Sequence, residues 1–313
     1  MDERSRIFVA GHRGLVGSAL VRRLQKEGFT RLSTRSRQEL DLTDPAATER
    51  FFRDERPDYV FLAAAKVGGI VANDTYPADF IRINLQIQTN VIDACHRHGV
   101  RKLLFLGSSC IYPRKARQPM TEDQLLTGPL EPTNAAYAVA KIAGITMVQA
   151  YRRQHGLNGI CLMPTNLYGP GDNFDLTSSH VVPALLRKFH EAKEAGVPEV
   201  VLWGSGTVRR EFLHVDDLAD ASLFLMREYD DPAIINVGRG EDMTIRELAD
   251  AIGETVGFRG RIVLDASKPD GTPRKLLDVS RITALGWAPS IGLREGLAGA
   301  YAWYVASAPT ENR

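Results

Sequence analysis

The sequence predicts an α/β protein with a doubly wound parallel sheet and a smaller C-terminal α/β lobe. Short apolar runs alternate with segments of helical period over the first two thirds of the 313 residues, and a glycine-rich turn follows the first run. After Met163, prolines and glycines replace this alternation, which indicates a second unit. A chain of this length can bury one large core or two unequal ones.

The apolar runs are too short for helices and fit buried strands. Each is followed by a longer segment whose apolar residues recur at intervals of three and four, as on one face of a helix. Such βαβ units form parallel sheets. We expect strands at 7–10, 31–34, 59–63, 103–106 and 161–163, and helices at 15–26 and 80–98.

The boundary of the second unit follows from the prolines and glycines that interrupt regular structure after residue 163. Residues 216–228 again have the pattern of an amphipathic helix, and residues 234–237 that of a strand which rejoins the main sheet. We therefore expect residues 1–165, rejoined by 213–238, to form the dinucleotide-binding domain. Residues 166–212 and 239–313 then form the smaller lobe.

Composition excludes several classes of protein. The formal net charge of +1 argues against a surface that collects nucleic acid or anionic membrane. No stretch approaches the roughly 20 apolar residues of a membrane span, and the polar start lacks the apolar core of a signal peptide. Cys95, Cys110 and Cys161 are too few for a disulfide framework or a metal site. We expect a cytoplasmic protein that binds no metal.

The first turn has the composition of a phosphate-binding loop. Gly11, Gly14 and Gly17 follow an apolar strand at once and open a helix, as in Rossmann-type folds. The first glycine permits a tight turn, the second lets the backbone approach a pyrophosphate, and the third lets helix and strand pack closely. The residues expected to hold the dinucleotide here are Gly11, His12, Arg13, Gly14, Leu15, Val16 and Gly17.

The end of the second strand indicates which dinucleotide binds. An acidic residue there would hold the free ribose hydroxyls of NAD, but this chain has Arg35, Ser36 and Arg37. Guanidinium groups bind a ribose phosphate, so Arg13 and Arg37 favour NADPH; solvated surface arginines are the alternative. Asp41 either accepts from the adenine amino group or serves an ordinary turn or cap.

Tyr137 and Lys141 are spaced four residues apart in a helical segment, so both lie on one helix face. A nearby cation favours the phenolate, which adapts a phenol to acid–base chemistry near neutral pH. About thirty residues upstream, the strand at 103–106 leads into Gly107, Ser108 and Cys110. A surface tyrosine with a solvated lysine is the alternative.

A serine at a strand end, a YxxxK pair and a glycine-rich first turn resemble the short-chain dehydrogenase/reductase superfamily in its extended form. The resemblance implies that Ser108 binds the substrate oxygen, Tyr137 exchanges its proton and Lys141 tunes the tyrosine. Longer strings resemble the GDP-L-fucose synthase family over nearly the whole chain. They are AAAKVGGI at 63–70, GSSCIYP at 107–113, MPTNLYGP at 163–170, WGSG at 203–206, REFLHVDD at 210–217 and KPDGTPRK at 268–275.

That resemblance implies an NADPH-dependent, bifunctional epimerase-reductase. It would convert GDP-4-keto-6-deoxy-D-mannose to GDP-L-fucose by 3,5-epimerisation followed by reduction of the 4-keto group. Cys110 and His180 are the implied acid and base for epimerisation; without the resemblance, each has an ordinary structural role as the alternative. The nucleotide-sugar would bind in the smaller lobe, at Lys188, Trp203, Arg210 and Asp270.

The resemblance also implies a homodimer that pairs two long helices, here 78–98 and 137–154. Further cofactor contacts are implied at Leu106, Gly107, Ser108, Ser109, Lys141, Pro164, Thr165, Asn166, Leu167 and His180. Two other readings stay open. One is another extended short-chain nucleotide-sugar epimerase or dehydratase with tightly bound NAD; the other is a non-catalytic, dinucleotide-sensing scaffold.

Overall fold

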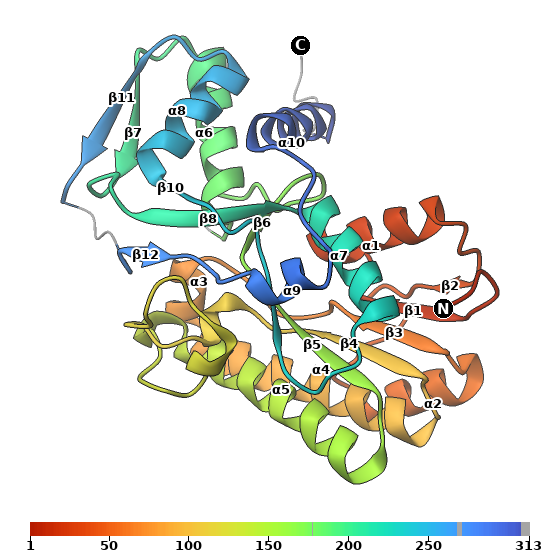
Figure 1. The fold of residues 1–313 in the computed structure, drawn as a ribbon. Coiled ribbons are helices and arrows are strands. Elements are labelled where there is room, and N and C mark those ends of the chain that lie inside the picture. The colour runs from red at the N-terminus through yellow and green to blue at the C-terminus, as the bar shows by residue number, and fades with distance from the viewer. Residues whose placement is uncertain (177, 268–270, 308–313) are drawn as a thin grey trace.

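A parallel sheet forms the centre of the computed structural model, which describes residues 1–176, 178–267 and 271–307. Within these residues the sheet has six strands in the order β2-β1-β3-β4-β5-β9, and every neighbouring pair is parallel (Figure 1). The expected fold class is confirmed. The strands are β1 (Ile7–Ala10), β2 (Leu32–Ser33), β3 (Tyr59–Leu62), β4 (Lys102–Leu106), β5 (Gly159–Pro164) and β9 (Ile235–Val237).

Helices cover both faces of this sheet, because its strands are apolar on both sides. Phe8 and Phe105 face one core, which α2, α4 and α5 complete, and Val9 and Leu104 face the other, which α1, α7 and α9 complete. The helices of the first core are α2 (Pro45–Glu55), α4 (Pro77–Arg97) and α5 (Ala135–His155). Those of the second are α1 (Leu15–Lys26), α7 (Val215–Glu228) and α9 (Ser280–Ala284).

The strand order places a crevice beside the glycine turn. From β1 the chain moves to β2 on one side, whereas β3, β4 and β5 follow on the other side. Ligands of doubly wound sheets bind at such a switch point, outside the carboxyl ends of the strands. Here those ends carry Gly11 after β1, residues 63–69 after β3 and Gly107–Cys110 after β4.

A smaller lobe lies above the main sheet in Figure 1. Its core joins α6, α8 and α10 to two small sheets, with Phe189, Phe212 and Ile252 among the buried side chains. Thr244 and Glu247 start α8 with a reciprocal capping box. The elements are β6 (Asn166–Tyr168), α6 (Val181–Glu194), β7 (Glu199–Trp203), β8 (Arg209–His214), β10 (Asp242–Thr244), α8 (Ile245–Val256), β11 (Arg261–Asp265), β12 (Arg274–Lys275) and α10 (Leu293–Ser307).

The two parts are interleaved along the chain. β9 pairs with β5 of the main sheet, although residues 165–234 separate the two strands. α9 and Trp287 also pack in a core of the main sheet, within a stretch that sequence alone places in the smaller lobe. Among the described residues, no helix is long and apolar enough to cross a membrane.

Candidate active site

The glycine turn shows why its positions exclude side chains. Gly11 has φ +84°, and a Cβ there would lie 2.8 Å from the backbone of Ala64. A Cβ on Gly17 would lie 2.1 Å from the carbonyl oxygen of Gly11, so α1 and β1 pack directly together. α1 has no side-chain cap and no acidic residue in its first turn, and its first N–H groups therefore suit a phosphate.

The arginines near the second strand have different surroundings. Arg35 is paired with Glu55 at 2.6 Å, donates to the carbonyl oxygen of Thr34 at 2.8 Å and lies over the ring of Phe51, so its guanidinium is already engaged. Arg37 is exposed over 73 % of its side chain and lies 3.9 Å from Asp41. Arg13 is exposed as well. Arg13 and Arg37 are thus accessible to an anion.

Asp41 has a local structural role. Its Oδ1 accepts from both the N–H and the hydroxyl of Thr43, at 2.9 and 2.8 Å. These two hydrogen bonds lower the pKa of the carboxyl group. The turn that the sequence offered as an alternative is present, and a contact with adenine stays a prediction.

Tyr137, Lys141 and Ser108 lie together where β4 ends and α5 begins. Lys141 is 4 % exposed and donates to the carbonyl oxygen of Leu106 at 2.8 Å. Its Nζ lies 5.8 Å from the centre of the Tyr137 ring. Ser108 caps a short 3-10 helix (Ser109–Ile111) by accepting from the N–H of Cys110 at 3.2 Å. The helical spacing and the strand end thus bring the three residues to one point.

Burial sets the protonation of this group. It raises the pKa of Tyr137 well above its usual value; a charge on Cys110 raises it further, and a hydrogen bond with Ser108 opposes the shift. Burial also lowers the pKa of Lys141 to about 8. In the cofactor-free protein Tyr137 is therefore a protonated phenol, able to give a proton to an oxygen that gains negative charge.

Cys110 lies between the tyrosine and the smaller lobe. Its charge acts on the pKa of Tyr137 and, from the other side, on that of Arg210 in β8. Burial lowers the pKa of Arg210, and among its described contacts the guanidinium donates only to the backbone oxygen of Arg209, at 2.8 Å. A partly buried cation that has no carboxylate partner among the described residues suits an anionic ligand.

His180 precedes α6 on the smaller lobe. Its side chain is exposed, yet the surrounding protein desolvates the imidazole and lowers its pKa below the usual value. Among the described residues, His180 makes no hydrogen bond with Cys110 or Tyr137. The structure therefore brings Cys110 close to the tyrosine, whereas the loop before His180 contacts the turn after β3 through the hydrogen bond from the Gly69 N–H to Ser178.

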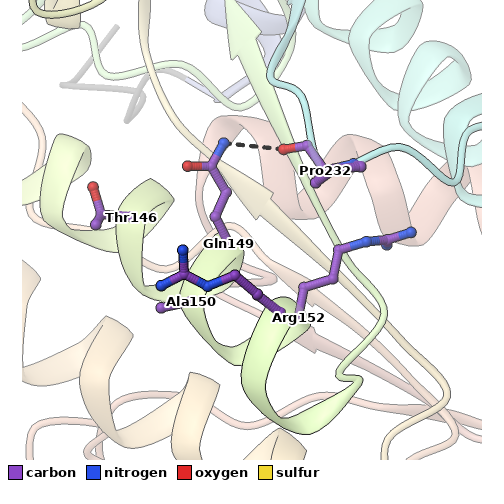
Figure 2. A pocket seen from close by; sticks show the side chains of 6 residues that line it. Thr146, Gln149, Ala150, Arg152 and Pro232 are labelled. Atoms are coloured by element: carbon purple, nitrogen blue, oxygen red, sulfur yellow. Dashed lines mark hydrogen bonds between the residues drawn. The ribbon is translucent and has the colours of Figure 1, made fainter.

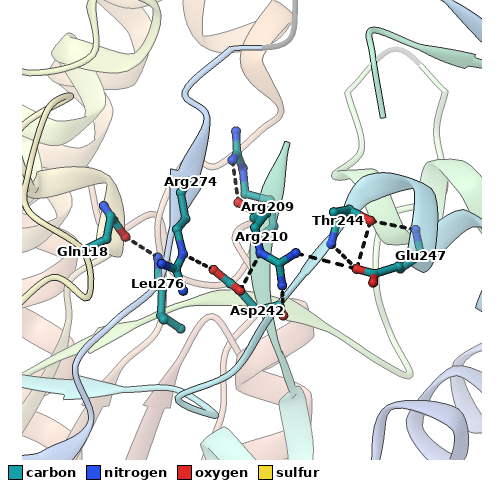
Figure 3. Close-up of polar contacts among 8 residues, drawn as sticks. All are labelled: Gln118, Arg209, Arg210, Asp242, Thr244, Glu247, Arg274 and Leu276. Carbon is teal, nitrogen blue, oxygen red and sulfur yellow. Dashed lines mark hydrogen bonds and ion pairs between the residues drawn. The ribbon is translucent and has the colours of Figure 1, made fainter. Parts of the chain in front are cut away.

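An ion-pair network fixes the strand that carries Arg210. Figure 3 shows Asp242 of β10 between Arg209 of β8 and Arg274 of β12, with Arg209 at 2.8 Å. β12 pairs with β8 so that Lys275 lies beside Arg210 and Arg274 beside Arg209. Because successive side chains on a strand point to opposite faces, Arg210 points away from the network.

The other expected substrate residues are spread over the smaller lobe. Lys188 of α6 donates to the carbonyl oxygen of Val201, and burial lowers its pKa. Trp203, at the end of β7, is 63 % exposed. Asp270 lies outside the described residues. No contact among the described residues joins Lys188 to Arg210.

The link from β5 to β6 is built around a buried carboxylate that sequence reasoning did not single out. Glu211 is fully buried and accepts from the N–H groups of Arg239, Gly240 and Leu277. Its own carbonyl oxygen accepts from Thr165 and Asn166. Pro164 ends β5, and Leu167 packs against the second core. This joint fixes the 164–167 backbone beside the crevice.

A hollow elsewhere on the surface carries none of these residues. It lies along the second half of α5, where Gln149 donates to the carbonyl oxygen of Pro232 at 3.0 Å (Figure 2). The residues that line it are Thr146, Gln149, Ala150, Arg152, Arg153 and Pro232. We assign it no part in the site.

The model of the NAD dependent epimerase/dehydratase family matches residues 7–238. The chain belongs to this family. It is 62 % identical over 304 residues to GDP-L-fucose synthase 1 of Arabidopsis thaliana, covering 97 % of this chain and 94 % of the relative. It is 58 % identical over 311 residues to GDP-L-fucose synthase of Escherichia coli (strain K12), covering 96 % and 97 %.

A solved structure of the family agrees closely in fold. The GDP-mannoheptose C4 reductase MlghC from Campylobacter jejuni, with NADP bound, superposes with a TM-score of 0.90 at 42 % identity. The match covers 97 % of this chain and 99 % of that one. The resemblance to GDP-L-fucose synthases predicted from the motifs is thereby confirmed, and the chain is that of an enzyme family.

Proposed function

We infer that this protein is an NADPH-dependent enzyme that converts GDP-4-keto-6-deoxy-D-mannose to GDP-L-fucose. The observation that carries this is the position of Cys110, which lies close enough to influence the pKa of Tyr137 on one side and that of the partly buried Arg210 on the other. A thiol beside the reductase tyrosine adds a proton-transfer group to a reductase site. The 62 % identity to a GDP-L-fucose synthase supports the same function.

The glycine turn, with uncapped N–H groups at the start of α1, fits the pyrophosphate of a dinucleotide. Arg13 and Arg37 are accessible for a ribose phosphate, and NADP is bound in the structurally similar C. jejuni reductase. The bound cofactor supplies the hydride for reduction. We assign the contacts at 106–109, 164–167 and His180 to its nicotinamide half.

Reduction needs a proton on the oxygen that was the ketone. Ser108 and Tyr137 each offer a hydroxyl, and Tyr137 is protonated because burial raises its pKa. As negative charge develops on the substrate oxygen, Tyr137 transfers its proton there and Ser108 donates a hydrogen bond. Lys141, held by Leu106, then stabilises the phenolate that remains.

Epimerisation needs a base and an acid at the carbons that flank the ketone, because the ketone acidifies their protons. We assign these roles to Cys110 and His180, because a thiol and an imidazole are side chains that can take up and release protons in enzyme sites. The two side chains come from different parts of the molecule. A substrate held between them can lose a proton on one side and regain one on the other.

Arg210 is the anchor that the geometry supports best for the diphosphate, since it is partly buried and has no carboxylate partner among the residues that the structure describes. Lys188, the exposed Trp203 and Asp270 are assigned to the same nucleotide-sugar. We further propose a cytoplasmic homodimer paired through α4 and α5. Residues 1–165 with 213–238 would bind NADP, and residues 166–212 with 239–313 the sugar nucleotide.

The test is oxidation of NADPH followed at 340 nm with GDP-4-keto-6-deoxy-D-mannose, with NADH in parallel and sugar analysis of the product. We expect NADPH consumption and GDP-L-fucose. Turnover without added NADPH, together with tightly bound NAD in the purified protein, would instead establish a 4-epimerase or dehydratase. Cofactor binding without any change in the sugar would indicate a sensing scaffold.

A further inference from the structure

We propose that Asn73 and Gly69 position His180 across the crevice between the two parts of the molecule. The contact involves Gly68, Gly69, Asn73, Ser178 and Ser179, which we call the crossing clamp. Asn73 and the two glycines follow β3 of the main sheet, whereas Ser178 and Ser179 directly precede His180. The inference rests on the proposed function, in which His180 exchanges protons with the sugar.

Asn73 fixes the main-sheet side of the clamp. It lies in α3 (Ile70–Thr75), is 7 % exposed, and donates from Nδ2 to two carbonyl oxygens, those of Gly68 at 2.7 Å and Gly69 at 3.0 Å. A carboxylate or an apolar group at position 73 could make neither bond. The amide donor therefore sets the conformation of the Gly68–Gly69 turn.

Gly69 links this turn to the segment that precedes His180. Its N–H donates to the carbonyl oxygen of Ser178 at 3.1 Å. A Cβ on Gly69 would lie 2.8 Å from the carbonyl oxygen of Ser179, which is closer than real Cβ contacts. Only glycine lets the turn approach the chain that leads into His180 so closely.

The segment before His180 is held in place by its own hydrogen bonds. Asp175 Oδ1 accepts from the N–H and the hydroxyl of Ser178, and its backbone oxygen accepts from the N–H of Ser179 at 2.9 Å. On the other side of His180, α6 packs in the core of the smaller lobe through the buried side chains of Val182, Leu186 and Phe189. Ala184 donates to the carbonyl oxygen of His180 at 3.1 Å.

This arrangement solves a positional problem. Cys110 follows β4 of the main sheet, but its proposed partner His180 belongs to the smaller lobe, so nothing within either part alone sets the separation of the two groups. The crossing clamp ties Ser178, two residues before His180, to the turn after β3, the strand next to β4. Asn73 and Gly69 are thus positioning residues for epimerisation.

The experiment compares Asn73→Ala, Asn73→Asp and Gly69→Ala with the natural protein. One readout is solvent deuterium uptake at the two sugar carbons that flank the ketone, with NADP+ bound. The other is the NMR titration of the His180 imidazole, which needs no substrate. We expect at least about tenfold slower deuterium uptake in all three variants and a His180 pKa that rises toward the ordinary value for histidine.

Two control variants separate positioning from general damage. Val71→Ala changes an exposed side chain on the same helix, and Gly299→Ala adds a Cβ where no atom lies within 4 Å. Both should match the natural protein, and circular dichroism should confirm folding of every variant. Natural uptake and titration in a folded Asn73→Asp and Gly69→Ala would overturn the inference. No uptake by the natural protein would instead refute the proposed function.

Discussion

The ammonium group of Lys141 donates a hydrogen bond of 2.8 Å to the carbonyl oxygen of Leu106, the last residue of β4. The lysine is thereby fixed to the strand that also delivers Ser108. The sheet, rather than the loop around Cys110, sets the position of the cation relative to Tyr137. Because this cation is buried, its protonation depends on pH in a range that can be measured.

The stability of the cofactor-free protein should depend on Lys141. Burial lowers its pKa from 10.5 to about 8, so the folded protein releases this proton at lower pH than the unfolded chain does. Between these values the unfolded state binds more protons, and stability therefore rises with pH. Relative to Lys141→Met, the natural protein should gain roughly 2 kcal/mol between about pH 7 and about pH 9.5. Urea unfolding of both proteins over this range measures the gain; a constant difference would contradict it.

Tyr137→Phe should stop reduction but spare proton exchange. The variant keeps the ring and loses the hydroxyl that gives the proton, so the rate of NADPH oxidation should fall by ~10²- to 10⁴-fold. Deuterium uptake beside the ketone should continue, because Cys110 and His180 are unchanged. Parallel spectrophotometry and NMR of the sugar measure both. Loss of both activities in a folded variant would mean that the two steps share the tyrosine.

Cys110→Ser should have the opposite effect. A hydroxyl in place of the thiol is a much weaker acid, so uptake of deuterium at the epimerised carbons should fall by ~10²-fold or more while NADPH still binds. His180→Gln should behave in the same way. Product analysis should show little GDP-L-fucose from either variant. Normal GDP-L-fucose production by both variants would show that Cys110 and His180 do not carry out the epimerisation.

Arg37→Ala should weaken NADPH without affecting NADH. An exposed guanidinium that pairs with the ribose phosphate is worth roughly a factor of ten in affinity. The KM for NADPH should rise by about that factor, and the KM for NADH should not change. Arg35→Ala is the matched control, because Arg35 is already paired with Glu55. Equal losses for both cofactors would show that Arg37 does not read the phosphate.

Asp242→Asn should destabilise the smaller lobe at neutral pH. Burial acts to raise the pKa of Asp242, but hydrogen bonds from Arg274 and Arg209 outweigh it and leave the pKa lowered. The ion pairs therefore contribute stability at neutral pH that is lost as pH falls through this lowered value. The free energy of unfolding of the variant should be about 1–3 kcal/mol lower than that of the natural protein at pH 7. This difference should become smaller at acid pH. Its KM for the sugar nucleotide should also rise, because Arg210 lies on the same strand.

Local patterns predicted the main sheet and the side chains that meet where β4 ends and α5 begins. The apolar runs at 7–10, 59–63 and 103–106 became strands within one residue of the expected bounds, because buried parallel strands are apolar on both faces. Tyr137 and Lys141 follow from spacing on one helix. Both features depend on residues close together in the chain.

The remainder depends on contacts that join distant segments. Glu211 stands among charged residues, and nothing local indicates that backbone N–H groups at 239, 240 and 277 bury it. The pairing of β7 with β11 brings together strands some sixty residues apart. The engagement of Arg35 by Glu55 likewise cannot be read from the run of arginines. Sequence spacing carries no signal for such pairs.

The interleaving of the two parts has a consequence for how this protein can be cut. A fragment that ends at residue 165 would lack β9 and leave one edge of β5, an apolar strand, without a neighbour. A fragment that begins at residue 166 would carry β9 and α7 without the sheet on which they pack. Expressed alone, each should aggregate; co-expressed, the two should associate and restore the sheet. Fusion partners and cleavage sites therefore belong in exposed loops, and not at the boundary between the two parts.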